Sequence, residues 1–383
     1  MPGRREGLAA GGRPPDRERA APAADEVTRR RYRVAVVTDG TAVPGRGAVG
    51  PAAALRLVDG KAILFAQLAA IEAVPICLPS MGPDEFVAAV RALAPSFDAI
   101  DLEAIATPAC FEVERRLQEA LDIPVFHDDQ HGTAIVVLAA LRNALRVVGK
   151  RVESARLVVI GAGPAGAATV RLLVAGGATD VVVVVRGGVL HRDDVPWLPP
   201  HEARLAGWTN LRRVRGGLAE ALAGADAVVG FSRAGVLTRE LVASMGEARV
   251  VFALAAPEPE IRPHLVSDIA TVVATCRADH PNQIDNALVF PGVFRGALDA
   301  EATWVTTSMK LAAADVLAGL IRREELSATR LLPEVRDDRV VPTVAGAVAA
   351  VAAELRRSSP PAAGGVPRQD AARSVSPQEG VGA

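Results

Sequence analysis

Apolar residues along this chain occur in short continuous runs, separated by longer stretches with a helical period. Runs such as RVAVV (33–37) and LVVI (157–160) are rich in β-branched residues, which is typical of strands buried on both faces. Between them, apolar positions recur every three or four residues, as in the amphipathic stretch 110–121. This alternation predicts an α/β protein with mainly parallel sheets. The strands expected are 33–37, 74–78, 99–102, 123–126, 157–160, 181–185, 227–229, 250–254 and 270–274.

The pattern divides the folded part into two units. A substrate and metal domain is expected over 26–150, and a dinucleotide-binding Rossmann domain with C-terminal helices over 151–357. The flanking segments 1–25 and 358–383 are rich in small and polar residues without an apolar period, which predicts a disordered arm and tail. The last two helices are expected to pack back on the first domain. The helices expected are one through Lys61 and Phe65, 83–93, 110–121, 133–148, one through Leu173, 304–320 and 341–355.

Composition excludes several classes of function. The net charge of −1 gives no reason to expect a nucleic-acid groove or a membrane patch. Cys77, Cys110 and Cys276 are far apart, so neither a disulfide framework nor a zinc site is expected, and a reducing cytoplasm is the default. No signal-peptide pattern is present, and the longest apolar runs, such as 181–185, are too short to span a bilayer.

The sequence GAGPAG (161–166) follows an apolar strand and opens a helix, with a second strand about twenty residues further on. Gly161 allows a tight turn, Gly163 lets the backbone approach a pyrophosphate, and Gly166 permits close packing of helix and strand. The helix N-terminus adds N–H donors and a positive dipole end. The pattern predicts a dinucleotide site; the alternative is a glycine-rich turn without a ligand.

The end of the next strand bears on the choice of cofactor. An NAD site usually has Asp or Glu there to bind the ribose hydroxyls, but this strand ends in Val185-Arg186. Valine cannot accept those hydrogen bonds, whereas Arg186 can meet a 2′-phosphate, which favours NADP over NAD. The alternative is that Arg186 is a solvated surface charge.

Acidic residues follow two of the predicted strands. Asp128 and Asp129, in the segment HDDQHGT, lie at the carboxyl end of a strand, where α/β sheets bind ligands. The alternative is helix capping, which needs one Asp at most. Glu103 follows the strand 99–102, and with Asp129 it offers hard oxygen ligands suited to Mg²⁺ or Mn²⁺. By itself it would be read as a surface charge; the neighbouring histidines are weaker candidates for metal ligands.

Lysine is rare in this chain. Of 43 basic residues, only Lys61, Lys150 and Lys310 are lysine. Lysine can shift its pKa and act as a base, which arginine cannot do. Lys61 is therefore a candidate base, and the alternative is chance retention on a helix surface.

These features together resemble the bacterial malic enzymes, over a span from about Val34 to Leu355. The resemblance implies an amino-acid-dehydrogenase-like N-terminal α/β domain followed by a Rossmann dinucleotide-binding domain. It also implies oxidation of malate with NAD or NADP, decarboxylation to pyruvate with help from Mg²⁺ or Mn²⁺, and a homodimer or higher homo-oligomer. The segments that carry it are VAVVTDGTAVPGRGAVGPAAALRLVDGKAILF, FDAIDLEAIATPACFEVERRL, LDIPVFHDDQHGTAIVVLAALRNALRVVGK, GAGPAG and ADHPNQIDNALVFPGVFRGALDA.

Position by position, the resemblance assigns roles to five residues. Lys61 matches the base that acts on the 2-hydroxyl group, and Asp128 its expected partner. Glu103 and Asp129 match the first and third metal ligands of the family. Asn286 matches an asparagine that contacts substrate.

The chain also departs from the family pattern. The catalytic tyrosine lies in a Tyr-[ST]-Pro segment upstream of the first strand, and this sequence contains no match for it; Tyr32 aligns with a non-catalytic position. A start assigned downstream of the true one would hide such a segment. The remaining departures are Ala104 for the second metal ligand, Ala256 for an asparagine, Asp285 for the first of an Asn-Asn pair, Val185 for the ribose-binding acid, and Pro44 in the glycine-rich loop.

Two hypotheses follow. Lys61 and the HDDQHG segment favour a malic-enzyme-like oxidoreductase, impaired by the lost groups. The missing tyrosine, Ala104 and Ala256 favour a catalytically inactive homologue that binds a nucleotide or metabolite, for example as a regulatory subunit.

Overall fold

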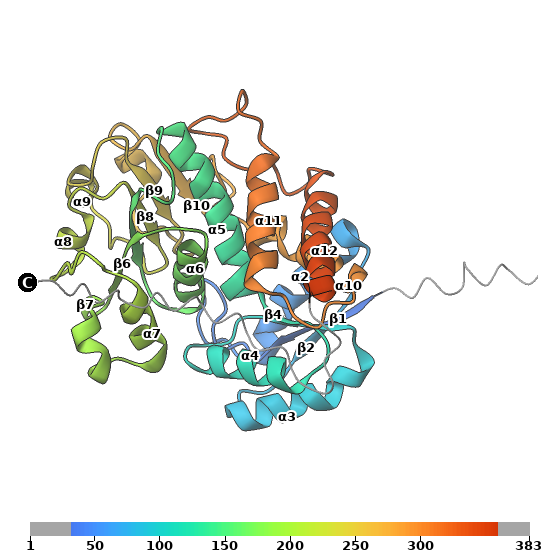
Figure 1. Ribbon diagram of the computed structural model, residues 1–383. Helices are drawn as coiled ribbons and strands as arrows, with labels where there is room; N and C mark the ends of the chain where they lie inside the picture. The colour runs from blue at the N-terminus through green and yellow to red at the C-terminus, as the bar shows by residue number, and fades with distance from the viewer. Residues whose placement is uncertain (1–31, 359–383) are drawn as a thin grey trace, which may run out of the picture. The chain divides into compact units, whose positions relative to one another are not determined.

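A computed structural model of the chain describes residues 32–358 (Figure 1). The expected arm 1–25 lies outside the described residues, as does the expected tail apart from Ser358. The first sheet is entirely parallel, in the order β2-β1-β3-β4. Its strands are β1 (Arg33–Thr38), β2 (Glu72–Cys77), β3 (Ala99–Leu102) and β4 (Val125–His127).

The second sheet has the order β10-β9-β8-β5-β6-β7, and only β7 in it is antiparallel. The chain reverses its direction of winding between β5 and β8, which is where open α/β sheets bind ligands. The strands are β5 (Arg156–Ile160), β6 (Asp180–Val185), β7 (Gly188–Val189), β8 (Ala227–Gly230), β9 (Val250–Ala253) and β10 (Val272–Thr275).

Helices connect the strands and cover the sheets. Figure 1 shows α5 between α6 and α11, with α12 beside α11. The α-helices are α2 (Pro51–Ala69), α3 (Pro83–Leu93), α4 (Ala109–Ala120), α5 (Asp128–Val147), α6 (Pro164–Ala175), α7 (Pro200–Trp208), α8 (Leu218–Leu222), α9 (Arg239–Ala243), α10 (Phe290–Asp299), α11 (Thr307–Gly319) and α12 (Val340–Ser358). The 3-10 helices are η1 (Ala94–Ser96), η2 (Arg192–Trp197), η3 (Pro263–Leu265) and η4 (Asn286–Leu288).

The continuous apolar runs are explained by burial on both faces of each sheet. In β1, Val34 and Val36 belong to a central core shared with α2, α5, α6 and α10 to α12, whereas Ala35 and Val37 face a second core with α3 and α4. In β5, Val159 faces the central core, while neighbouring residues face a third core with α8 and α9. Alternate residues of one strand therefore enter different cores, so no polar face interrupts the run.

Helix α5 begins earlier than expected. It starts at Asp128, not near Thr133, so the residues after His127 in the HDDQHG segment open the helix and do not form a loop before it. Two carboxylates in a first turn are favoured by the positive end of the helix dipole. Neither Asp caps the helix, because the N-cap residue is His127 and its side chain makes no capping hydrogen bond.

Of the two last helices, α11 contacts α5, whereas α12 packs on α10 and α11. Helices α10 and α11 contact α2 and α5, which follow β1 and β4. Both sheets therefore share one core, and the boundary between 150 and 151 remains a prediction. Within residues 32–358, none of the helices combines the length and apolar character needed to cross a membrane.

Candidate active site

Lys61 lies on α2, and its amine contacts the residues that directly follow β3 and β4. Its side chain is buried, and its ammonium group is in direct contact with the Glu103 carboxylate. The Lys61 Nζ atom is 2.7 Å from Asp128 Oδ2 and 3.3 Å from Asp101 Oδ2. It also lies 4.7 Å from the centre of the Phe290 ring. Lys61 is therefore not a surface lysine.

The parallel strands bring the acidic residues to one edge. Asp101 lies on β3, and Glu103 directly follows its last residue. Because the two residues are two positions apart, their side chains point to the same face of the sheet. Asp128 and Asp129 follow directly from the neighbouring strand β4. Asp128 is fully buried, whereas the Asp129 side chain is 20% exposed, so the cluster opens to solvent at Asp129.

The buried charges shift one another's pKa. Burial raises the pKa of Glu103 and of Asp128 to about 7 in each case, and it raises that of Asp101 well above its ordinary value. Burial alone would lower the pKa of Lys61, but the attraction of Asp101, Asp128 and Glu103 outweighs it and raises the pKa well above the ordinary value. Four carboxyl groups around one ammonium cannot all be ionised cheaply, so the ligand-free cluster retains protons.

Glu103 and Asp129 lie near each other, because, after burial, the charge of Asp129 is the largest influence that raises the pKa of Glu103. Asp129 Oδ2 also accepts a hydrogen bond from the backbone N–H of Ala104, at 2.7 Å. Ala104 itself is buried, has a φ of 54° and packs with Val43 and Ala54. Over residues 32–358, no three His, Cys, Asp or Glu side chains are arranged to hold a metal ion. Two neighbouring carboxylates with raised pKa values do fit a divalent cation, whose charge would offset theirs.

Several polar atoms of the cluster are left without partners. The buried side-chain atoms with no hydrogen bond in the described part of the chain include Oδ1 of Asp101, both ring nitrogens of His127 and Oδ1 of Asp128, whereas Oδ2 of Asp101 has its ion pair with Lys61. Such atoms are rare in folded proteins and indicate that water, an ion or a ligand belongs beside them.

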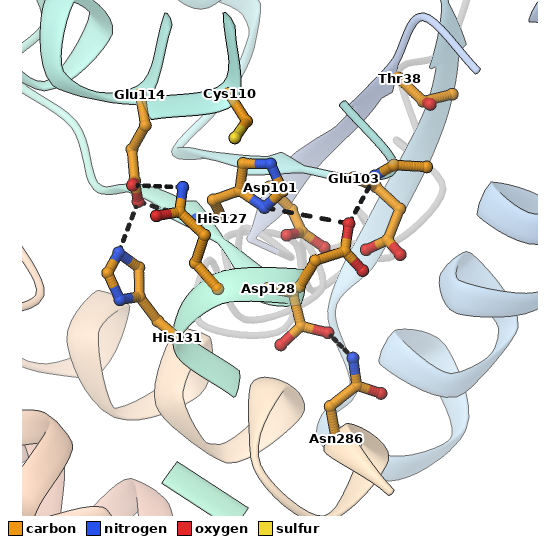
Figure 2. A network of polar contacts seen from close by, with 12 residues as sticks. Thr38, Asp101, Glu103, Cys110, Glu114, His127, Asp128, His131 and Asn286 are labelled. Atoms are coloured by element: carbon orange, nitrogen blue, oxygen red, sulfur yellow. Dashed lines mark hydrogen bonds and ion pairs between the residues drawn. The ribbon is translucent and has the colours of Figure 1, made fainter. Parts of the chain in front are cut away.

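A residue from the far end of the chain completes the cluster. Asn286, in η4, donates a hydrogen bond from Nδ2 to Asp128 Oδ2 (Figure 2). Gly132 lies one turn after Asp128, and a Cβ at this position would overlap the Asp128 carboxylate. The structure thus brings together Lys61, Glu103, Asp128, Asp129 and Asn286, the residues that the sequence singled out for substrate and metal.

The GAGPAG segment forms a tight turn between β5 and α6. Gly161 has a φ of 102°, and a Cβ there would meet the carbonyl oxygen of Phe231. A Cβ on Gly166 would meet the carbonyl of Gly161, so this glycine does permit close packing of helix on strand. Gly163 precedes the first residue of α6 and has open space beside it. The turn lies where the second sheet reverses its winding.

Val185 and Arg186 end β6 and begin the turn to β7. Val185 pairs with Gly188 in the antiparallel hairpin, and Arg186 is exposed. Arg186 is therefore free to meet an anionic ligand, and its role in cofactor choice remains a prediction.

Two buried acids of this region were missed by the sequence reading. The position of Asp101 could have been recognised from the sequence, because it precedes Glu103 by two residues and the two side chains therefore share one face of the strand. Glu114 lies on an amphipathic helix and gave no sign of burial, yet it is 6% exposed and hydrogen-bonded to the segment around Asp128. The Tyr32 ring packs against Arg295 on α10, whose guanidinium carbon lies 5.7 Å from the ring centre.

The chain matches known sequences over most of the described fold. Two family models match: the malic enzyme N-terminal domain over residues 13–81 and the malic enzyme NAD-binding domain over residues 266–353. An NAD-dependent malic enzyme of Geobacillus stearothermophilus is 47% identical, covering 84% of this chain and 67% of that enzyme. A bifunctional malic/malolactic enzyme of Bacillus subtilis is 46% identical, covering 84% of this chain and 78% of that enzyme.

Solved structures agree in fold. The malic enzyme of Pyrococcus horikoshii superimposes with a TM-score of 0.81 at 44% identity, covering 85% of this chain and 77% of that one. The NAD-dependent malic enzyme of Thermotoga maritima gives a TM-score of 0.80 at 40% identity, covering 90% of this chain and 96% of that one. The predicted fold class, an N-terminal α/β domain followed by a Rossmann domain, is confirmed. Sequence identity and fold agree over the same span, and on both grounds this chain belongs to the malic enzyme family.

Proposed function

We propose that this protein is an oxidoreductase that converts malate to pyruvate by oxidative decarboxylation, with NAD or NADP and a divalent metal. The observation that carries the proposal is the cluster in which Lys61, Asp128 and Asn286 lie beside three further carboxyl groups, with buried polar atoms that form no hydrogen bond in the described part of the chain. Relatives named NAD-dependent and NADP-dependent malic enzymes support it.

In this proposal Lys61 removes the proton of the malate 2-hydroxyl group, and Asp128 holds the amine in place. Asn286 orients the substrate from η4, and the Gly161, Gly163 and Gly166 turn binds the dinucleotide pyrophosphate. Glu103 and Asp129 hold Mg²⁺ or Mn²⁺. When bound, this ion polarises the substrate oxygens and offsets the negative charge of the cluster.

A coupled assay tests the proposal. The protein is incubated with malate, Mn²⁺ and each cofactor, while NAD(P)H and pyruvate are measured together. Formation of both products supports the enzyme. Binding of cofactor to a folded protein, with no product at any pH, supports the inactive, nucleotide-binding homologue instead.

A finer proposal concerns the protonation of enolpyruvate, because none of residues 1–383 matches the tyrosine segment of the family. Protonation of enolpyruvate is the step that the family tyrosine assists, so we propose that this step is slowed more than hydride transfer. Loss of a general acid typically costs about 10²- to 10⁴-fold in rate. Conversion of enolpyruvate to pyruvate, measured separately from malate oxidation, decides this; equal efficiency in the two assays would contradict it.

We further propose that the chain acts in the cytoplasm as a homodimer or higher homo-oligomer, without a nucleic-acid or membrane partner. The support is the family membership and the near-neutral charge of −1. Light scattering of the purified protein measures the oligomeric state directly, and a monomer would contradict the proposal.

A further inference from the structure

Glu114, on α4, has no role in the chemistry proposed above, yet its carboxylate lies at the centre of a polar network. It accepts a hydrogen bond from the backbone N–H of His127 at 3.1 Å and another from Gln130 Nε2 at 2.9 Å. His131 Nε2 lies 2.9 Å from the same carboxylate, as Figure 2 shows. The side chain is buried, so these bonds are not shared with bulk solvent.

The donors lie on both sides of the aspartate pair in the sequence. His127 directly precedes Asp128, and Gln130 and His131 directly follow Asp129. The Glu114 carboxylate thus holds the backbone before Asp128 and the side chains after Asp129 in place. A small rotation of this first helical turn would move both aspartates, because they share its backbone.

The same network reaches the dinucleotide-binding helix. Gln130 Oε1 accepts a hydrogen bond at 3.2 Å from Arg171 Nη2, and Arg171 lies on α6, two turns beyond the GAGPAG turn. Burial lowers the pKa of Arg171 and of Lys310, and in each case the negative charge of Glu114 offsets part of this effect. Burial alone would raise the pKa of Glu114, but its bond to His131 and the charge of Lys310 hold it at about 2.

We propose that Glu114 is a positioning residue for the malate site: it clamps the Asp128-Asp129 turn and, through Gln130, fixes that turn against helix α6. The proposal rests on the proposed function for its catalytic consequence, whereas the clamp itself is a structural claim that can be tested without turnover.

The test compares Glu114→Gln with a control on the same helix, Glu112→Gln, whose exposed carboxylate pairs with Arg116. Glu114→Gln keeps the size of the side chain but replaces one acceptor by a donor. A third variant, Arg171→Met, breaks the bond to Gln130 and leaves Glu114 intact. For each folded variant we would measure hydrogen exchange of residues 125–135, Mn²⁺ affinity by electron paramagnetic resonance, and kcat and KM with malate and 2-deuterated malate.

Glu114→Gln is expected to speed exchange at residues 127–131 and to weaken Mn²⁺ binding by roughly 10-fold or more. It should also lower kcat by about 10- to 100-fold with little change in KM, since misplaced reacting groups slow the chemical step more than binding. Arg171→Met should leave Mn²⁺ affinity unchanged, while kcat falls and the deuterium isotope effect rises. Glu112→Gln should match the wild type in all measurements.

The proposal is overturned if Glu114→Gln lowers only the melting temperature and matches Glu112→Gln in exchange, Mn²⁺ affinity and kcat. If the wild-type protein does not oxidise malate, the proposed function fails while the clamp is still decided by exchange and Mn²⁺ affinity. A change in both hydrogen exchange and Mn²⁺ affinity in Glu114→Gln then supports the clamp, and the absence of any change in them overturns it.

Discussion

Lys61 lies among carboxyl groups from two strands, and its protonation depends on all of them. In the ligand-free protein these carboxylates hold the proton on Lys61, so the amine becomes a base only when the negative charge around it is offset. Asp101 matters here although it matches none of the family roles, because it is fully buried and 3.3 Å from Lys61 Nζ.

Replacing Lys61 by arginine should abolish turnover and preserve the fold. Arginine keeps a positive charge for Asp101, Glu103 and Asp128, but it cannot give up its proton and act as a base. Malate-dependent NAD(P)H formation should fall by about 10²- to 10⁴-fold. Unchanged cofactor affinity and thermal unfolding would show that the fold is intact, and wild-type turnover in the variant would assign the base to another residue.

The variant Ala104→Asp should tighten Mn²⁺ binding and destabilise the metal-free protein. A third carboxylate increases ligand number and negative charge at the Glu103 and Asp129 pair. Without metal, the same carboxylate enters the space beside Val43 and Ala54, where burial of a charge is costly. Mn²⁺ titrations and melting temperatures with and without Mn²⁺ check both effects, and an unchanged Mn²⁺ affinity would separate Glu103 from the metal site.

At the scale of elements, the site depends on where helices begin. The first turn of α5 carries both aspartates, and a side chain at Gly132 would overlap the Asp128 carboxylate. The first turn of α6 similarly requires Gly166, whose missing side chain lets the helix approach Gly161.

A methyl group at Gly132 should therefore displace Asp128 and remove activity. Gly132→Ala is expected to lower kcat by about 10²-fold, the effect of a displacement of about 1 Å. Gly60→Ala is a matched control: Gly60 neighbours Lys61 on α2, and a Cβ there has open space. It should keep full activity and stabilise the helix by about 1 kcal/mol. Equal activity of the two variants would contradict the packing seen at Asp128.

The hairpin of β6 and β7 should set the preference for cofactor. Val185→Asp restores a carboxylate for the ribose hydroxyls and repels a 2′-phosphate, so NAD affinity should rise and NADP affinity should fall. In the wild type, NADP should bind at least as well as NAD. Titration calorimetry measures both, and tighter wild-type binding of NAD by about 10-fold, or about 1.4 kcal/mol, would refute the NADP preference.

At the scale of the whole molecule, proton binding, metal binding and stability are coupled. The ordinary pKa of Asp and Glu is about 4, whereas burial raises that of Glu103 and Asp128 to about 7. The folded protein therefore holds protons that the unfolded chain has lost, and this contribution to stability declines as pH rises towards 7.

Stabilisation by Mn²⁺ should consequently grow with pH. The ion must displace protons from the carboxyl cluster, so the rise in melting temperature on adding Mn²⁺ should be small near pH 5.5 and large near pH 8. Scanning calorimetry across this range measures the effect. Asp129→Asn serves as the control and should show little Mn²⁺-dependent shift at any pH, whereas a shift that does not depend on pH would rule out this cluster as the metal site.

Local pattern determined much of this fold. The run 33–37 and the run 157–160 were recognisable as buried strands because β-branched residues pack on both faces of a parallel sheet. The GAGPAG turn was recognisable because the backbone itself requires glycine at 161 and 166. The start of α5 was placed five residues late, because Gly132 and the polar residues before it read as a loop, while tertiary packing carries the helix through them.

The sequence by itself thus determined the family, the fold class and the candidates Lys61, Glu103 and Asp129, because these depend on local residue order. Only the tertiary structure decided which side chains meet. The bond between Asn286 and Asp128 joins positions 158 residues apart, and the burial of Glu114 on α4 depends on α5, whose Gln130 and His131 lie against its carboxylate. Such contacts follow from the packing of helices around parallel strands, and residue spacing along the chain carries no record of them.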